Sequence, residues 1–286
     1  MTGRPKAWAA LLTHPSYVVG VRALRASLER VGSAYPLVVA VTDGIGPDDR
    51  ALLEADGCLL REVEPLRPPS GLPDSYANAR FAEVWTKLGV WRLTEFERLV
   101  VLDADMLVTQ DMDELFDLAL DDDEIAACHA CRCNPNRIAT YPASWTPAGC
   151  AYTYLAGADP GSVEVADPYF NGGILVLRPD QAVFDALVGE LAAVDDLSRY
   201  VFAEQDFLNE HFRGRWVALP YVYNALKTLP FQHPDLWDPA AVKNIHFIID
   251  KPWESELDPA SRYFELERQW WDVAADLVPR PVDAGV

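Results

Sequence analysis

The chain has 286 residues and a net charge of −20, from 44 acidic and 24 basic side chains. Half of the residues (50%) are hydrophobic, which is enough to give one large α/β domain a sizeable core. Because nucleic acids and anionic membrane surfaces are bound through basic patches, this charge argues against both kinds of partner.

The first part of the chain alternates short apolar runs with segments of helical periodicity. The apolar runs predict strands at 8–13, 37–43, 58–65 and 98–105. The helical spacing of apolar side chains predicts helices at 17–31, 47–57 and 81–91. Continuous apolar strands that alternate with helices are typical of a parallel sheet covered on both faces. Such sheets bind ligands beyond the carboxyl ends of their strands.

The second part of the chain is less regular. Further strands are predicted at 125–130, 170–179, 216–220 and 244–250, and further helices at 180–194, 204–212 and 261–277. The long segment 131–169 is rich in Pro, Tyr and Cys, and a loop of that length is more often functional than idle. No repeat or linker interrupts the chain, so a single domain over 1–286 is expected.

The cysteines and the apolar runs indicate in which cellular compartment the protein is expected. Five cysteines, an odd number in a chain of this length, do not form the pattern of a secreted disulfide framework. The early apolar run WAALL is too short for a signal-peptide core, and no run reaches the ~18 apolar residues of a membrane span. A cytoplasmic protein that does not bind membranes is therefore expected.

Two aspartates follow the strand predicted at 98–105, in the segment LDADMLV. Because side chains alternate along a strand, Asp103 and Asp105 point to the same side. Two hard oxygen donors suit Mg²⁺ or Mn²⁺, metals that are commonly shared with substrate phosphates. A solvated turn is the competing interpretation. A phosphatase with an aspartyl-phosphate intermediate also carries Asp-x-Asp, but on its first strand and with a later Gly-Asp pair, which this sequence lacks.

Later segments add groups that a site for a metal and a diphosphate needs. In NIHFIIDKPW, His246 is a borderline nitrogen ligand and Lys251 is a point charge for phosphate. The segment FNGG places Asn171 and two glycines at a strand start, where the backbone can approach a ligand closely. Two acids and an amide stand together at 204–206, at a helix start. The ordinary alternatives are a core histidine, a β-bulge and acids that favour the helix dipole.

The segment CHACRC raises the question of zinc. It brings Cys128, His129, Cys131 and Cys133 together in the sequence, and these residue types are zinc ligands. No second ligand pair follows at the spacing of a zinc finger. A role in shaping the loop is therefore favoured over a metal site.

Taken in order, several motifs resemble glycosyltransferase family 8, the retaining nucleotide-sugar transferases that include glycogenin and galactinol synthase. They are LLTHPSY, TKLGVW, LDADMLV, YFNGGILV, AEQDFLN, LPYVYN and HFIIDKPW. The resemblance covers residues 7–275. The stretches SAYPLVVAVTDG and GCLLREVEP are particularly similar to galactinol synthase, whereas CRCNP is more similar to the fungal-type members.

The resemblance implies a fold and an activity. The fold is GT-A, a Rossmann-like mixed α/β sheet flanked by helices, with a nucleotide-binding half at 1–115 and an acceptor-side half at 116–286. The activity is hexosyl transfer, with retention, from a UDP-sugar to a hydroxyl acceptor, with Mn²⁺ as cofactor and Mg²⁺ as its alternative. A cyclitol or sugar is the first choice of acceptor and a glycan the second. A non-catalytic sugar-nucleotide binder and a glycogenin-like self-glycosylating protein are the alternatives, and a homodimer is the oligomer to consider.

The resemblance also assigns positions, residue by residue. The metal ligands are Asp103, Asp105 and His246. The positions in contact with the donor nucleotide are Leu11, Thr13, Tyr17, Lys87, Ala104 and Lys251. The positions around the transferred sugar are Asn171, Glu204, Gln205 and Asp206, with Glu204 or Asp206 as the candidate nucleophile. In one departure, the segment FIID stands where glycogenin and galactinol synthase carry a glycine between the late histidine and Lys-Pro-Trp.

Four aromatic residues of the segment 131–169 are candidates for the acceptor side. They are Tyr141, Trp145, Tyr152 and Tyr154. Aromatic rings can stack on the faces of sugars, or they can pack the loop onto the domain.

Overall fold

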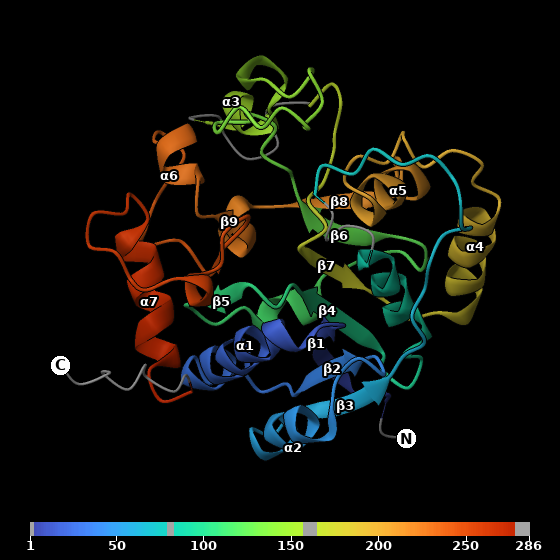
Figure 1. The fold of residues 1–286 in the computed structure, drawn as a ribbon, viewed down its shortest axis with the longest axis horizontal. Helices are drawn as coiled ribbons and strands as arrows, with labels where there is room; N and C mark the ends of the chain where they lie inside the picture. Colours follow the sequence, from blue (N-terminus) through green and yellow to red (C-terminus); the bar gives the residue numbers. More distant parts are fainter. Residues whose placement is uncertain (1–2, 79–82, 157–164, 278–286) are drawn as a thin grey trace.

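The computed structural model describes residues 3–78, 83–156 and 165–277. Its main sheet has seven strands in the order β3-β2-β1-β4-β7-β6-β8 (Figure 1). The bounds are β1 (Lys6–Leu12), β2 (Leu37–Val41), β3 (Leu59–Glu62), β4 (Arg98–Leu102), β6 (Ile125–Cys128), β7 (Ile174–Leu177) and β8 (Trp216–Leu219). Strands β1 to β4 pair in parallel, whereas β7 runs antiparallel to both β4 and β6. The parallel arrangement is confirmed for the first four strands, and the sheet as a whole is mixed.

A second, three-stranded sheet lies beside the main one. It consists of β5 (Met106–Val108), β10 (Asn244–His246) and β9 (Ala225–Leu226), in that order. Strand β10 runs antiparallel to β5, and His246 pairs in register with Met106. The short strand β5, which the sequence did not predict, therefore brings a histidine from late in the chain next to the two aspartates.

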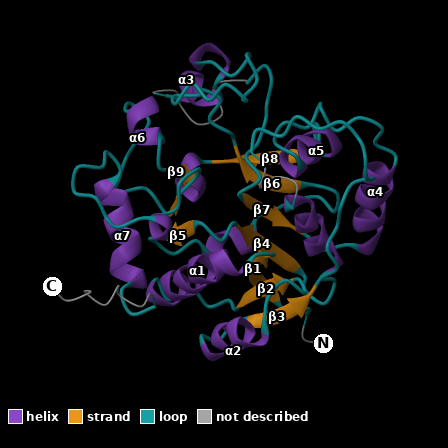
Figure 2. Cartoon of the chain, viewed as in Figure 1, coloured by secondary structure: helices purple, strands orange, loops and turns teal. Residues whose placement is uncertain are grey.

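Helices cover both faces of the main sheet, as Figure 2 shows. Side chains of Trp8 and Ala10 pack toward α1 (Val18–Arg30) and α2 (Pro47–Ala55), whereas their neighbours Ala7 and Ala9 belong to the core on the other face. That other face is covered by the 3-10 helix η3 (Val84–Arg92), α4 (Gln181–Ala192) and α5 (Glu204–His211). The alternation of side chains along β1 thus fills two cores at once.

Further helices complete the described part of the chain. They are α3 (Ala151–Leu155), α6 (Leu229–Gln232), α7 (Phe264–Ala274), and the 3-10 helices η1 (Pro15–Tyr17), η4 (Asp113–Asp117), η5 (Pro147–Gly149), η6 (Tyr221–Asn224) and η7 (Pro252–Glu254). The segment predicted as a helix at 81–91 is a 3-10 helix from Val84, and residues 79–82 lie outside the described residues. Among the helices of the described residues, none is both long and apolar enough to cross a membrane.

Helix α1 packs directly against the turn that carries the aspartates. Gly20 is buried in α1, and a Cβ atom there would collide with the backbone oxygen of Ala104 and come within 2.7 Å of the Trp253 ring. The absence of a side chain at this position therefore lets the helix and the turn approach one another.

We expect the substitution Gly20→Ala to lower the free energy of unfolding by ~1–3 kcal/mol, because α1 must move away from Ala104 to make room. Gly189→Ala is the matched control. It lies in α4, is exposed and has no atom within 4 Å of a built Cβ, so it should be neutral or stabilise by up to ~1 kcal/mol. Urea unfolding measures both variants. Equal stability of the two would show that the close approach does not exist.

Candidate functional site

A cavity of about 750 Å³ opens at the carboxyl ends of β1 and β4. Segments far apart in the sequence form its walls, including the ends of these strands, the start of α5 and the loop that follows β6. The site residues proposed from the sequence that line it are Leu11, Thr13, Tyr17, Lys87, Asp103, Ala104, Asp105, Asn171, Glu204, Gln205, His246 and Lys251. The structure thus brings the residues proposed for the metal, the nucleotide and the transferred sugar to one cavity, with the exception of Asp206.

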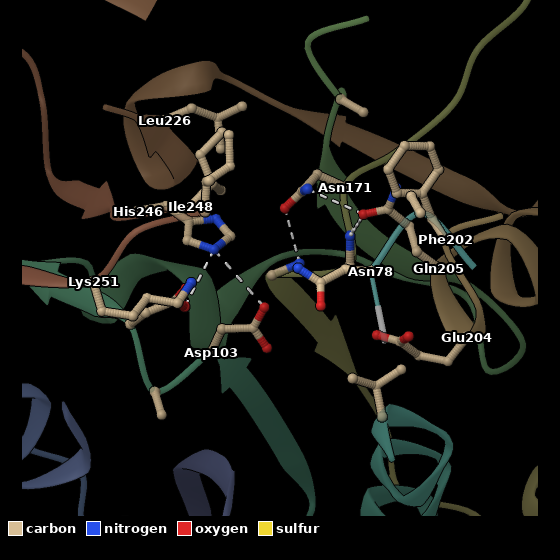
Figure 3. Close-up of a pocket in the computed structure, with 18 of the residues that line it drawn as sticks. Asn78, Asp103, Asn171, Phe202, Glu204, Gln205, Leu226, His246, Ile248 and Lys251 are labelled. Carbon is tan, nitrogen blue, oxygen red and sulfur yellow. Dashed lines mark hydrogen bonds and ion pairs between the residues drawn. The ribbon is translucent and has the colours of Figure 1, made fainter. Parts of the chain in front are cut away.

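Asp103, Asp105 and His246 meet on one wall of this cavity, and Figure 3 shows Asp103 and His246 facing one another there. Their ligand atoms lie within 4.8 Å of one another. The Nε2 atom of His246 is 3.3 Å from Oδ1 of Asp105 and 3.9 Å from Oδ2 of Asp103. Two carboxylates and one imidazole nitrogen, all facing an open cavity, form a donor set that fits Mn²⁺ or Mg²⁺.

The other nitrogen of the His246 ring is held by an amide. Nδ1 lies 2.8 Å from Oδ1 of Asn224, a residue that is 1% exposed. Because a carbonyl oxygen can only accept a hydrogen bond, this contact holds the N–H on Nδ1 and leaves Nε2 as the nitrogen that can bind a metal. Sequence reasoning missed Asn224. Its signal was present, since the residue ends the motif LPYVYN.

The hydrogen bonds continue from Asn224 across the cavity wall. Its Nδ2 donates to Oδ1 of Asn171 (2.8 Å), and Nδ2 of Asn171 donates to Oε1 of Gln205 (3.0 Å). The same Gln205 oxygen accepts the backbone N–H of Gly172. Each amide is thereby fixed in one orientation, so the position of His246 depends on residues of the loop before β7 and of α5.

Asp206, which the sequence proposed as a catalytic residue, does not line the cavity. Its carboxylate accepts hydrogen bonds from the Tyr169 hydroxyl (2.5 Å) and from the backbone N–H of Phe202 (2.7 Å). The Tyr169 oxygen in turn accepts from Nε2 of Gln205 (2.8 Å). Asp206 therefore acts through Tyr169 to orient Gln205. The sequence cannot reveal this, because neighbouring residues of a helix point in different directions.

Two buried lysines balance the charge of the acids. Nζ of Lys87 lies 2.7 Å from Oδ1 of Asp103 and 3.2 Å from Oε1 of Glu204. Nζ of Lys251 forms an ion pair with Asp105. Burial lowers the pKa of Lys87, but the carboxylates of Asp103 and Glu204 outweigh it and raise the pKa. Burial raises the pKa of Asp105, but Lys251 and His246 outweigh it and hold the pKa well below its usual value.

For Glu204, the effect of burial on the pKa outweighs the effect of the neighbouring lysine. Burial raises the pKa of its carboxyl group to about 7, against the lowering effect of Lys87 and with a further rise from Asp103. The residue before it, Ala203, has a φ of 47°, which is a strained backbone conformation for a residue with a side chain. This turn sets Glu204 and Gln205 at the first residues of α5, on the cavity wall.

The glycines of the FNGG segment serve the packing of the site itself. A Cβ atom on Gly173 would lie 2.5 Å from Cε1 of His246 and 2.8 Å from Oδ1 of Asn171. A side chain at position 173 would therefore displace the His246 ring or the Asn171 amide. Gly172 and Gly173 both line the cavity, as the sequence predicted for a backbone that a ligand can approach.

The segment FIID contains an unusual backbone conformation. Ile249 has a φ of 69°, in the left-handed region that favours glycine. For a β-branched residue this conformation is strained. Ile249 lines the cavity and is 37% exposed. Ile249 thus places a bulky apolar side chain on the cavity wall from a left-handed backbone conformation.

The aromatic residues of the segment 131–169 divide into two groups. Tyr141 and Trp145 line the cavity, and Trp145 stacks on Phe202 with ring centroids 4.3 Å apart. Tyr152 is buried and donates its hydroxyl hydrogen to the backbone oxygen of His129, while Tyr154 is 54% exposed and does not line the cavity. The first pair is placed to meet a ligand, and the second pair is not.

The CHACRC segment does not act as one cluster. Cys128 belongs to β6 and its thiol contacts the backbone oxygen of Pro220 (3.2 Å), while the His129 ring packs against Trp216. Cys131 and Cys133 instead pack with Cys150 in a separate core cluster. The set of Cys128, His129, Cys131 and Cys133 considered from the sequence is therefore wrong as a zinc site.

Comparison with known proteins agrees with this architecture. The model of the family described as "Glycosyl transferase family 8" matches residues 9–256. Galactinol synthase 7 of Arabidopsis thaliana is 33% identical over 268 residues, which cover 91% of this chain and 78% of that protein. Galactinol synthase 1 of Ajuga reptans is 30% identical over 282 residues, which cover 96% of this chain and 82% of that protein.

Solved structures share the fold. The galactosyltransferase LgtC, in complex with donor and acceptor sugar analogues, matches with a TM-score of 0.65 and 18% identity, covering 97% of this chain and 98% of LgtC. The apo form of the bifunctional glycosyltransferase WbbM matches with a TM-score of 0.65 and 19% identity. That match covers 96% of this chain but only 50% of WbbM. The expected GT-A fold is confirmed.

The contact between Asn224 and His246 predicts an effect on metal affinity. We expect Asn224→Ala to weaken Mn²⁺ binding by about 10- to 100-fold, because the ring loses the acceptor that fixes its orientation. Asn224→Asp keeps an acceptor oxygen, so its Mn²⁺ affinity should fall less than that of Asn224→Ala. Asn244→Ala is the control, since Asn244 is equally buried on β10 but bonds to the backbone oxygen of Tyr223. Titration of Mn²⁺ followed by electron paramagnetic resonance measures the affinities. Equal losses in the two alanine variants would contradict the role of Asn224.

The pKa of Glu204 predicts a pH dependence of stability. Because its pKa rises from 4.5 to about 7 on folding, the stability it contributes is complete below pH 4.5 and is lost as the pH rises through about 7. Glu204→Gln cannot titrate. The stability of the natural protein relative to this variant should therefore fall by ~1–3 kcal/mol between pH 4.5 and 8.

Urea unfolding at several pH values, without added metal or nucleotide, measures this difference. Glu256→Gln, at an exposed glutamate, is the control. A constant difference between the natural protein and Glu204→Gln would show that Glu204 ionises at its ordinary pH.

Proposed function

Because the chain belongs to glycosyl transferase family 8, we propose that it transfers a hexose from a UDP-sugar to a hydroxyl group, with retention of the anomeric configuration. The observation that carries this proposal is the arrangement of one cavity. It is lined by the donor set of Asp103, Asp105 and His246. Beside this set lie Asn171, Gln205 and Glu204 (Figure 3). A nucleoside diphosphate sugar whose diphosphate is held at the first set would present its sugar to the second.

We assign the uracil base to the part of the cavity at the end of β1. Leu11, Thr13 and Tyr17 line it at the end of β1 and the start of α1. Tyr17 packs edge-on against Trp253, with ring centroids 5.7 Å apart. This contact supports the ring from one side, and the proposed role of Tyr17 is to stack on the base.

The diphosphate is assigned to the wall that carries the aspartates. A divalent cation bound by Asp103, Asp105 and His246 would supply positive charge for the leaving diphosphate. Lys251 adds an ammonium group on the same wall, and it is held by the carboxylate of Asp105 and the backbone oxygen of Phe247 (3.2 Å). We assign Lys251 to the diphosphate, where its charge matters most as negative charge builds on the leaving oxygen.

The transferred sugar is assigned to Asn171, Gln205 and Glu204. Glu204 is the carboxylate of this wall, since Asp206 is committed to Tyr169 and Phe202. It either attacks the anomeric carbon to form a glycosyl-enzyme, or stabilises positive charge while the acceptor attacks from the side of the leaving group. Both routes retain the configuration. Gln205 is a poor nucleophile, and its fixed amide is suited to orient the sugar.

The acceptor is proposed to be a small hydroxylated molecule, with a cyclitol as first choice. The similarity to galactinol synthases favours a cyclitol, and Tyr141 and Trp145 place aromatic rings on the cavity wall. Flat apolar faces of sugars and cyclitols pack well on such rings. The net charge of −20 disfavours polyanionic acceptors.

The test is turnover. We expect Mn²⁺-dependent hydrolysis of UDP-galactose or UDP-glucose, transfer to myo-inositol or a simple sugar, and loss of both with a chelator. Asp103→Asn should lower turnover by a hundredfold or more, on the order of the loss seen when metal sites are disturbed. Asp48→Asn, at an exposed position of α2, should leave it unchanged.

Mass spectrometry identifies the product among reactions with cyclitols, sugars and a glycan panel, and proton NMR gives its anomeric configuration. A product of inverted configuration would contradict retention. Tight UDP-sugar binding without any turnover would favour the non-catalytic alternative. Full activity of Asp103→Asn in the presence of chelator would contradict the metal site.

A further inference from the structure

A second cluster of metal-ligating side chains lies beside the cavity. It consists of Cys131 and Cys133, from the loop after β6, Cys150, just before α3, and His233, just after α6. Figure 1 shows α6 and the loops around α3 as neighbours at the top of the molecule. All four side chains are buried, and none of the cysteines forms a disulfide.

The four ligand atoms surround one point. Nε2 of His233 lies 3.6 Å from the sulfur of Cys131, 3.2 Å from that of Cys133 and 3.5 Å from that of Cys150. The sulfurs of Cys131 and Cys150 are 3.9 Å apart. Tetrahedral zinc, with Zn–S of about 2.3 Å and Zn–N of about 2.0–2.1 Å, separates its ligands by about 3.6 Å (S to N) and about 3.8 Å (S to S). The separations that involve Cys131 and Cys150 lie within about 0.1 Å of these values, and the separation between His233 and Cys133 is about 0.4 Å shorter.

We propose that the three cysteines and His233 bind one structural Zn²⁺. Four ligands close the coordination sphere, which is typical of a structural rather than a catalytic zinc. Thiolates and imidazole select zinc over Mg²⁺ or Mn²⁺, which prefer oxygen ligands. Binding converts the three thiols to thiolates, and their protons pass to the solvent. The site is separate from the proposed donor site, and the zinc proposal does not depend on the proposed function.

Ordinary core packing explains the cluster less well. Buried thiols often pack as small apolar groups, and the neighbours here are indeed apolar, among them Tyr152, Leu226 and Leu229. Packing alone, however, gives no reason for a histidine nitrogen to face three sulfurs. A single polar ring in an apolar pocket is costly unless the nitrogen is bound.

The position of the cluster indicates what the metal does. The loop that leaves Cys133 carries Asn134, Tyr141 and Trp145 to the cavity wall and then returns at Cys150. Zinc would fasten both ends of this loop to His233, which lies 83 residues beyond Cys150. A cross-link between segments so far apart in the sequence restricts the unfolded chain and fixes the acceptor side of the cavity.

The metal content of the purified protein tests the proposal. We expect one zinc per chain, measured by inductively coupled plasma mass spectrometry after expression with zinc and purification without chelator. Cys150→Ser and His233→Ala should lose most of it. Cys58→Ser is the matched control, because Cys58 is also buried but lies just before β3, outside the cluster. Asp103→Asn should keep its zinc, which separates this site from the donor site.

Cobalt gives a second readout that does not depend on the variants folding. The natural protein, stripped of metal under reducing conditions and loaded with Co²⁺, should show the visible bands of four-coordinate cobalt and a thiolate-to-metal charge-transfer band. Addition of a chelator should lower the melting temperature, and zinc should restore it. A folded natural protein that holds no zinc and gives no thiolate–cobalt band would overturn the proposal, as would a disulfide between Cys131 and Cys150.

Discussion

The site depends on a balance of buried charge at the end of β4. Asp105 is 6% exposed, and it is paired with Lys251, which is 8% exposed. Lys87 is similarly buried and bridges Asp103 and Glu204. A buried carboxylate without such a partner is strongly destabilising, whereas a paired one is tolerated. The two lysines therefore allow acids to be concentrated next to the sheet, where a cation can reach them from the cavity.

This balance of buried charge requires segments of the main chain to approach one another closely around the site. Gly20 lets α1 touch the turn between the two aspartates, and Gly173 leaves room for the ring of His246. Ala203 and Ile249 take up strained backbone conformations beside the cavity. Strain of this kind persists when the surrounding structure determines it, and it gathers at functional sites. The shape of the cavity is thus set by the main chain as much as by the side chains.

The sequence predicted the local features of the fold and missed those that depend on distant contacts. Apolar runs identified the strands of the main sheet, but β5 and β9, with three and two residues, are too short for a pattern to form. Asp103 and Asp105 stood out because they follow a buried strand. Asn224 and His233 did not, because their roles come from partners far along the chain. The orientation of Asp206 away from the cavity could not be seen either, since it depends on the hydroxyl of Tyr169.

The two proposed metal sites lie close together and yet suit different cations. Asp103, Asp105 and His246 offer two oxygens and one nitrogen on an open wall, so ligand positions remain for a diphosphate and for water. The cysteine cluster offers three sulfurs and one nitrogen in a closed, apolar setting, and it leaves no position free. A cation that arrives and leaves with a substrate needs the first kind of site, whereas a cation that holds a loop in place needs the second. Ligand softness keeps the two apart, because thiolates favour zinc and carboxylates favour Mn²⁺ or Mg²⁺.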